Sequence, residues 1–194
     1  MYIVALNGSP NKQGNTYWLL DEILKECKKQ GAKIEIIQVP EVLQTAKWPF
    51  CTACSNPCSG ACFKDTALEK AYEKMSKADA VLIGSPVYFG SVSAQLKAFF
   101  DKTRKVRSQK SFVNLIGAGV TVGAAKYGGQ ETTIKAIHDM MLVQGMTIVG
   151  DGHMDYDAGH HGVCARKPAH EDEFAQKRIK VLAARIIQAV GMKK

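Results

Sequence analysis

The sequence predicts an α/β protein in which helices cover both faces of a parallel sheet. Short apolar runs alternate along the chain with amphipathic stretches, which is the order expected when crossover helices join successive strands. Runs such as Tyr2–Leu6 and Ala80–Ile83 are apolar throughout, as is typical of strands buried on both faces. The 194 residues are 46% hydrophobic and 23% charged, which is enough apolar material for the core of one domain.

The first half of the chain divides at glycines and prolines. The strand Tyr2–Leu6 meets Asn7-Gly8, and the strand Lys33–Val39 ends at Pro40. Between them, Thr16–Gln30 is a predicted helix that Gly31 ends. Its apolar side comprises Trp18, Leu19, Leu20, Ile23, Leu24 and Cys27, so Cys27 is expected in the core. Residues 40–65 are expected to be irregular, and Thr66–Lys77 is a short predicted helix.

The second half repeats the alternation. The third strand, Ala80–Ile83, ends in Gly84-Ser85-Pro86. Further strands are predicted at Phe112–Ala118 and Thr147–Gly150. Helices are predicted at Val92–Thr103, at Gln130–Gln144 and from Pro168 or Ala169 to Val190, and residues 151–167 are expected to form an ordered loop.

Five strands in this order fit the doubly wound arrangement 2-1-3-4-5 of the flavodoxin-like class, in which ligands bind beyond the carboxyl ends of the strands at the topological switch. We therefore expect residues 1–194 to form a single domain with a cysteine-rich insertion at about residues 47–65. The loops after the first, third and fourth strands are where a ligand is expected.

The loop after the first strand has the composition of a phosphate site. Small residues allow backbone N–H groups to turn inward, and a helix N-terminus adds a partial positive charge. No Gly-Lys-Ser/Thr or G-x-G-x-x-G motif is present. The alternative is an ordinary strand-to-helix turn. The expected phosphate-binding residues are Ser9, Asn11, Gly14, Asn15 and Thr16.

Three segments together resemble the NADPH-dependent FMN reductase and iron–sulfur flavoprotein families. They are Asn7-Gly-Ser-Pro-Asn-Lys-Gln-Gly-Asn-Thr16, Ser85-Pro-Val-Tyr-Phe-Gly-Ser-Val-Ser-Ala94 followed by Leu96–Asp101, and Gly128-Gly-Gln-Glu131. The resemblance covers nearly the whole chain and implies FMN as cofactor, NAD(P)H as a possible electron donor, and a homodimer or homotetramer.

The two later loops suit the flavin ring. Backbone N–H groups in a tight loop can bond the ring edge, and two aromatic side chains can wall it, although such a pair can also simply pack beside the next helix. The ring-contacting residues are expected to be Pro86, Val87, Tyr88, Phe89 and Gly90. By resemblance, Gly123, Gly128 and Gly129 lie near the ring, and Lys126 and Tyr127 contact the ring or a pyridine nucleotide.

Four cysteines, Cys51, Cys54, Cys58 and Cys62, form a compact run. Their spacing fits one helix face, but Pro57 and Gly60 oppose a helix there, and a helix would spread the outer sulfurs by about 16 Å. A compact run favours a [4Fe–4S] cluster, with zinc or free thiols as alternatives. Iron–sulfur flavoproteins carry such a run here, usually with two residues between the second and third cysteines where this chain has three.

The formal net charge of +8 favours anionic partners, such as an acidic ferredoxin. No basic stripe interleaved with aromatics, membrane segment or signal peptide is evident, so we expect a cytoplasmic protein that binds no nucleic acid. Cys164 with His153, Asp155, Asp157, His160 and His161 matches no metal-ligand spacing, and a subunit contact is the preferred interpretation.

Three functions follow as hypotheses. The first is an FMN-dependent oxidoreductase that passes electrons between a donor and an acceptor through FMN and a [4Fe–4S] cluster. The second is a cluster-free NAD(P)H-dependent FMN or quinone reductase. The third is a carrier or binding protein, such as a flavodoxin-like electron shuttle. In each of the first two, the cofactor supplies the chemistry and no catalytic side chain is required.

Overall fold

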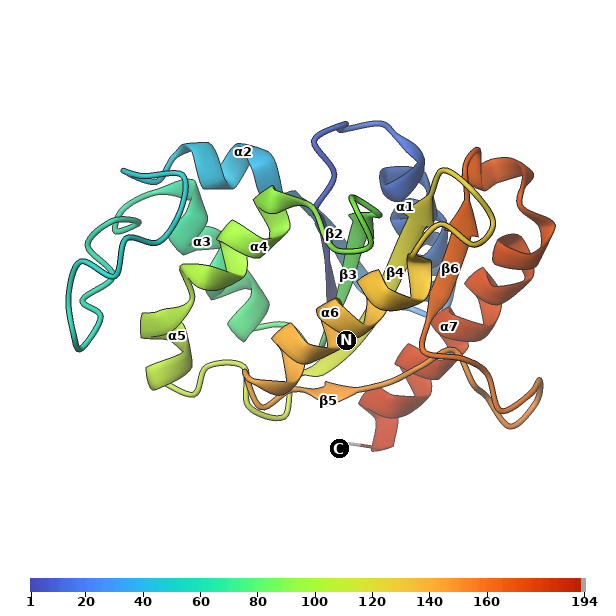
Figure 1. Cartoon of the computed structure of the whole chain (residues 1–194). Helices are drawn as coiled ribbons and strands as arrows, with labels where there is room; N and C mark the ends of the chain where they lie inside the picture. Colours follow the sequence, from blue (N-terminus) through green and yellow to red (C-terminus); the bar gives the residue numbers. More distant parts are fainter. Residues whose placement is uncertain (193–194) are drawn as a thin grey trace.

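A computed structural model describes residues 1–192 of the chain (Figure 1). All strand pairs are parallel, and the strand order β2-β1-β3-β4-β5 confirms the predicted doubly wound, flavodoxin-like sheet. The strands are β1 (Tyr2–Asn7), β2 (Lys33–Gln38), β3 (Ala80–Pro86), β4 (Ile116–Gly123), β5 (Thr147–Ile148) and β6 (Val163–Arg166). The helices are α1 (Asn15–Lys29), α2 (Val39–Gln44), α3 (Ala67–Ser76), α4 (Ala94–Asp101), α5 (Arg104–Ser108), α6 (Gln130–Leu142), the 3-10 helix η1 (Ala169–Glu171) and α7 (Glu173–Met192).

The sheet divides the hydrophobic core into two layers. Successive residues of β1 point to opposite faces, so Ile3 and Ala5 pack under α1 and α7. Val4 and Leu6 pack on the other face, under α2, α3, α4 and α6. Cys27 of α1 is buried in the first layer as predicted, and burial raises the pKa of its thiol to about 12.

The fourth strand lies farther along the chain than the predicted Phe112–Ala118. Phe112 is a buried core residue that precedes β4, whereas the glycine-rich stretch up to Gly123 is extended and central in the sheet. A Cβ at Gly117 would lie 2.4 Å from the sulfur of Met141, and one at Gly119 would lie 3.1 Å from Ile134. These glycines allow α6 to pack closely on the strand, which is why a loop-like composition forms a strand here.

Two expectations of irregular structure were wrong in part, because each segment contains one short regular element. In residues 40–65, the helix α2 extends to Gln44. β2 ends at Gln38, and Pro40 stands in the first turn of α2, where its fixed φ and missing N–H are tolerated. In residues 151–167, Val163–Arg166 form β6, which pairs with Val120–Gly123 at the end of β4. β5 and β6 therefore share the position in the sheet next to β4, because β5 pairs with Ile116 and Gly117 at the start of that strand and β6 pairs with its end.

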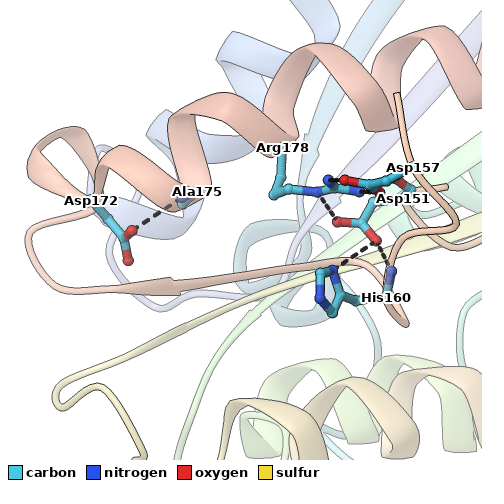
Figure 2. A network of polar contacts seen from close by, with 6 residues as sticks. All are labelled: Asp151, Asp157, His160, Asp172, Ala175 and Arg178. Carbon is cyan, nitrogen blue, oxygen red and sulfur yellow. Dashed lines mark hydrogen bonds and ion pairs between the residues drawn. The ribbon is translucent and has the colours of Figure 1, made fainter. Parts of the chain in front are cut away.

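A buried ion pair holds the segment that connects β5 and β6 against α7 (Figure 2). The Nε of Arg178 donates to Asp151 at 2.6 Å, and both guanidinium NH₂ groups donate to the Asp157 carboxylate at 2.6 and 3.0 Å. Asp151 is 0% exposed and also accepts from the backbone N–H of His160. The hydrogen bonds from Arg178 lower the pKa of Asp157, so this contribution to stability is present at neutral pH and is lost as the pH falls through that pKa.

Removing the Arg178 guanidinium is expected to lower the free energy of unfolding. Arg178→Met leaves the buried Asp151 carboxylate without its counter-charge, and we expect a loss of about 3–5 kcal/mol in urea unfolding. Arg185→Met, on the same helix, is the control, because within residues 1–192 the side chain of Arg185 hydrogen-bonds only Gln188 and the change should stay within about 0.5 kcal/mol. Equal losses in the two variants would contradict a role for the buried pair.

Candidate functional site

Three loops meet where β1, β3 and β4 end. The backbone N–H of Gly8 donates to the carbonyl of Gly84 at 2.8 Å, which ties the loop after β1 to the end of β3. A Cβ at Gly8 would lie 2.8 Å from that carbonyl and 2.9 Å from the Cβ of Leu96, so the contact requires glycine. The loops predicted to bind the ligand are thus brought to one edge of the sheet.

Two buried serines that the sequence analysis did not select fix this junction. Ser93 donates from its Oγ to the carbonyl of Gly8 at 2.6 Å and accepts from the N–H of Leu96 at 3.2 Å, so it also caps α4. The Oγ of Ser85 accepts from the N–H of Ser93 at 3.0 Å and donates to the carbonyl of Pro86 at 2.8 Å. Ser93 lay inside the predicted helix Val92–Thr103, and the available signal was that serine is a favoured residue at the start of a helix.

The loop after β1 is held by short-range side-chain hydrogen bonds. Asn7 Oδ1 accepts from the N–H of Ser9, Ser9 Oγ from that of Asn11, and Asn11 Oδ1 from that of Gln13, each at 3.1 Å. A Cβ at Gly14 would lie 3.0 Å from the Asn11 side chain, which explains the glycine. These hydrogen bonds fix the backbone of the loop at three successive points.

The N-terminus of α1 is left without a cap. Its N-cap residue is Gly14, the first turn holds no acidic residue, and no side chain bonds the helix end. Within residues 1–192, the N–H groups of Asn15, Thr16 and Tyr17 have no protein acceptor. Thr16 is 2% exposed, and its hydroxyl makes no hydrogen bond in that range, whereas Asn15 Oδ1 accepts from the N–H of Ala169 at 2.7 Å. Free donors at a helix N-terminus fit a phosphate group.

The aromatic pair in the loop after β3 is exposed at the surface. Tyr88 is about half exposed and Phe89 is fully exposed, with a positive φ of 50°. Neither side chain fills the core, and both line one hollow with Ala94 and Lys97 of α4, so packing beside that helix stays an alternative. The next residue, Gly90, contacts the loop after β4, because a Cβ at Gly129 would lie 3.0 Å from the Cα of Gly90.

Gln130 organises the loop after β4, and the sequence analysis did not single it out. Its Nε2 donates to the carbonyl of Ala125 at 2.6 Å, and its Oε1 accepts from the N–H of Gly128 at 2.8 Å. A Cβ at Gly123 would lie 2.5 Å from the same amide. The exposed Lys126 and Tyr127 line a hollow of about 420 Å³ with Arg166 and Phe174.

The four-cysteine segment is separate from these loops. In Figure 1 it projects beside α3 at the far end of the molecule from α7. All four cysteines are free thiols, Cys54 is exposed, and the other three are partly buried. Within residues 1–192 no three Cys, His, Asp or Glu side chains are arranged to hold a metal ion. The donor chemistry suits a cluster, and Lys102 Nζ lies 3.7 Å from the sulfur of Cys62, but the four sulfurs are not gathered.

The histidine-rich segment does not provide a metal site either. Asp157 is bound by Arg178, and His153 contacts Asp155 at 3.6 Å. Cys164 lies on β6 rather than in a loop, where Thr121 donates to its sulfur at 3.6 Å. No helix within the described residues has the length and apolar composition that crossing a bilayer requires.

The strand order and these loops define a flavodoxin-like domain. Its sequence matches the NADPH-dependent FMN reductase family over residues 1–160. An iron-sulfur flavoprotein of Methanosarcina thermophila is 34% identical over 194 residues, 99% of this chain and 96% of that protein. Another, from Methanocaldococcus jannaschii, is 38% identical over 84% of this chain and 83% of its own length.

The crystal structure of a flavodoxin, WrbA-like protein from Agrobacterium tumefaciens has a TM-score of 0.69 at 17% identity and covers 100% of this chain and 98% of its own. That likeness concerns the fold alone. The sequence matches decide the family: the chain belongs to the NADPH-dependent FMN reductase family and is an FMN-dependent oxidoreductase.

The contact at Gly8 leads to a prediction about the whole site. Gly8→Ala places a methyl group against the carbonyl of Gly84, so we expect a stability loss of about 1–3 kcal/mol and a sharp loss of bound FMN. Gly191→Ala is the control, because nothing lies within 4 Å of its Cβ position. Thermal unfolding and the flavin absorbance of purified protein measure both effects. Full flavin content in the Gly8 variant would refute this dependence.

Proposed function

We propose that FMN binds across the three loops, with its phosphate at the N-terminus of α1. The uncapped amides of Asn15, Thr16 and Tyr17 carry this proposal, because they and the Thr16 hydroxyl offer unused donors at the helix end with the positive dipole. Ser9, Asn11 and Gly14 shape the cradle. Pro86–Gly90 and the glycines Gly123, Gly128 and Gly129 then border the ring, where the exposed Tyr88 and Phe89 would cover it.

We further propose that Cys51, Cys54, Cys58 and Cys62 hold a [4Fe–4S] cluster. The four free thiols within one short segment and the names of the relatives support this proposal. FMN accepts electrons singly or in pairs and a cluster accepts one, so together they would link a two-electron donor to one-electron acceptors. To bind a cluster, the segment would have to bring its four sulfurs closer together. Cys54 is exposed, so the core does not hold it in place.

The place of the cysteine segment bears on how electrons would pass. In Figure 1, α4 lies between this segment and the loop Pro86–Gly90. A cluster on the segment would therefore serve the flavin of a second copy better than its own. This arrangement favours a homodimer or homotetramer in which neighbouring copies complete the electron path.

The charges suggest two kinds of redox partner for the flavin. The net charge of +8 suits an acidic one-electron carrier such as a ferredoxin. The hollow lined by Lys126, Tyr127 and Arg166 offers two cationic side chains and an aromatic face to NAD(P)H, and Glu131 and Asp172 on the same lining balance the charge. Fast ferredoxin reduction with slow NAD(P)H turnover would favour the first partner.

The alternative is a cluster-free NAD(P)H-dependent flavin or quinone reductase. It is favoured by the dispersed sulfurs, since no three potential ligands within residues 1–192 are gathered. Iron and acid-labile sulfide, measured per FMN on protein purified without oxygen, separate the two functions. About four of each per flavin supports the cluster, and FMN with neither supports the reductase.

The phosphate assignment predicts the effect of removing one hydroxyl. Thr16→Val keeps the side-chain shape but loses the donor, so the Kd for FMN should rise about tenfold or more, as expected for a hydrogen bond to a charged group. Thr16→Ser retains the hydroxyl and should bind FMN nearly as the parent protein does. Fluorescence quenching of FMN titrated with apoprotein measures both constants. Unchanged affinity in the valine variant would place the phosphate elsewhere.

The cluster assignment predicts a selective loss of iron. Cys54 is exposed and makes no core contact, so Cys54→Ser should lower bound iron several-fold while FMN and the fold persist. Cys164→Ser, outside the segment, is the matched control and should keep its iron. Metal analysis beside the flavin spectrum gives the answer. Equal iron in both variants would remove Cys54 from the ligand set.

A further inference from the structure

Helix α6 and strand β6 meet along one seam beside β4. Gly162, which directly precedes β6, lies so close to β4 that a Cβ there would be 2.3 Å from the carbonyl oxygen of Gly119 and 2.7 Å from an isoleucine of α6. At the first residue of α6, the Nε2 of Gln130 donates to the carbonyl of Ala165 at 3.4 Å, and the same amide holds the loop after β4. We call the contact of α6 with residues 161–165 the α6–β6 seam. A movement of β6 along this seam therefore reaches that loop.

His138 lies in the α6–β6 seam, about two turns along α6 from Gln130. The centroid of its ring is 5.9 Å from that of His161, and the two ring planes are tilted by 35°. Its Nε2 is buried, hydrogen-bonds no group within residues 1–192, and would lie 3.7 Å from a Cβ at Gly119. A buried nitrogen without an acceptor suits the neutral imidazole, in which one of the two nitrogens carries no proton.

Few charged groups surround His138 in the described part of the chain. β4 has no titratable side chain, and no Asp or Glu oxygen within residues 1–192 lies within 4.0 Å of a His138 nitrogen. Burial lowers the pKa of His138, and the ring of His161 lowers it further, whereas the backbone of His161 and the Asp139 carboxylate raise it. The titratable groups on the elements packed against the ring are His161 before β6, Cys164 and Arg166 on β6, and Glu131, Lys135 and Asp139 on α6. Both carboxylates among them are exposed, so an imidazolium here has no buried counter-charge.

We propose that His138 makes the α6–β6 seam acid-sensitive: its protonation loosens the seam and, through Gln130, the loop that borders the FMN site. The second half of this proposal rests on the FMN site proposed above. An imidazolium in the seam would bury a new N–H without an acceptor and set a positive charge beside His161, and both effects disfavour the packed form. Folding therefore favours the neutral ring, so the seam is fully stable above about pH 6.5 and loses stability as the pH falls below that value.

Two substitutions separate the titration of His138 from its packing. His138→Phe keeps a flat ring that cannot be protonated, with room left by Gly119, and His138→Gln is a second uncharged variant in case the phenylalanine variant folds poorly. His170→Gln removes an exposed histidine on η1 and is the matched control. The Tm of the full chain is measured from about pH 7.5 to about pH 5.5, with and without added FMN. The Arg178–Asp157 ion pair stays formed across this range, because the pKa of Asp157 lies below its usual value.

We expect acidification to lower the Tm of the parent protein and of His170→Gln equally, and to lower the Tm of either His138 variant by no more than about half as much. The Kd for FMN, from fluorescence quenching, should rise several-fold more on acidification in the parent protein than in the His138 variants. The phosphate of FMN gains a proton near pH 6, about the same for every variant, so the difference between variants is the result that counts.

An equal acid-induced fall in Tm in the parent protein and in both His138 variants would overturn the acid-sensitive seam. A smaller fall in Tm in the variants, with the same acid-induced rise in Kd as the parent protein, would overturn the link to the flavin loop. A parent protein that binds no FMN at any pH would refute the FMN site alone, because the Tm series without FMN still decides whether the seam is acid-sensitive.

Discussion

The close approach of the chain after β1 to the end of β3 is the constraint on which the rest of the site depends. Gly8 bonds the carbonyl of Gly84, and Ser93 bonds the carbonyl of Gly8, so three segments share one junction. Ser93 also begins α4, which couples helix position to loop position. From this junction the α1 N-terminus and the exposed aromatic loop face the same edge of the sheet, and a flat cofactor with an anionic end can bridge them.

Two buried cations show different uses of charge in one fold. Arg178 forms ion pairs with Asp151 and Asp157. This interaction is structural, because it holds the segment between β5 and β6 in place. Lys102 Nζ lies 3.7 Å from the sulfur of Cys62, the one hydrogen-bond partner of that ammonium within residues 1–192. The contrast connects the chemistry of the cysteine segment to the core beneath it.

Local patterns predicted most of the fold. The first strand and helix agree with the structure to within one residue at each end, because an apolar run and a helical stripe are properties of the segment itself. The predictions failed where packing outweighed composition. The glycines of β4 look like a loop but admit α6, and β6 forms because a free edge of β4 receives it. Of the site, the loops were predictable and Ser93 carried a local helix-cap signal, but Ser85 and Gln130, which also hold the loops, carried none.

The sequence by itself determined the alternation of strands and helices, the loops rich in small residues and the run of four thiols, because each is a matter of neighbouring residue types. Only the tertiary structure decided that Gly90 touches Gly129, that Tyr88 and Phe89 stand exposed, and that Lys102 is buried against Cys62. The last pair is 40 residues apart in the chain. Contacts of that kind depend on how whole elements pack across the sheet, and no local pattern records the packing.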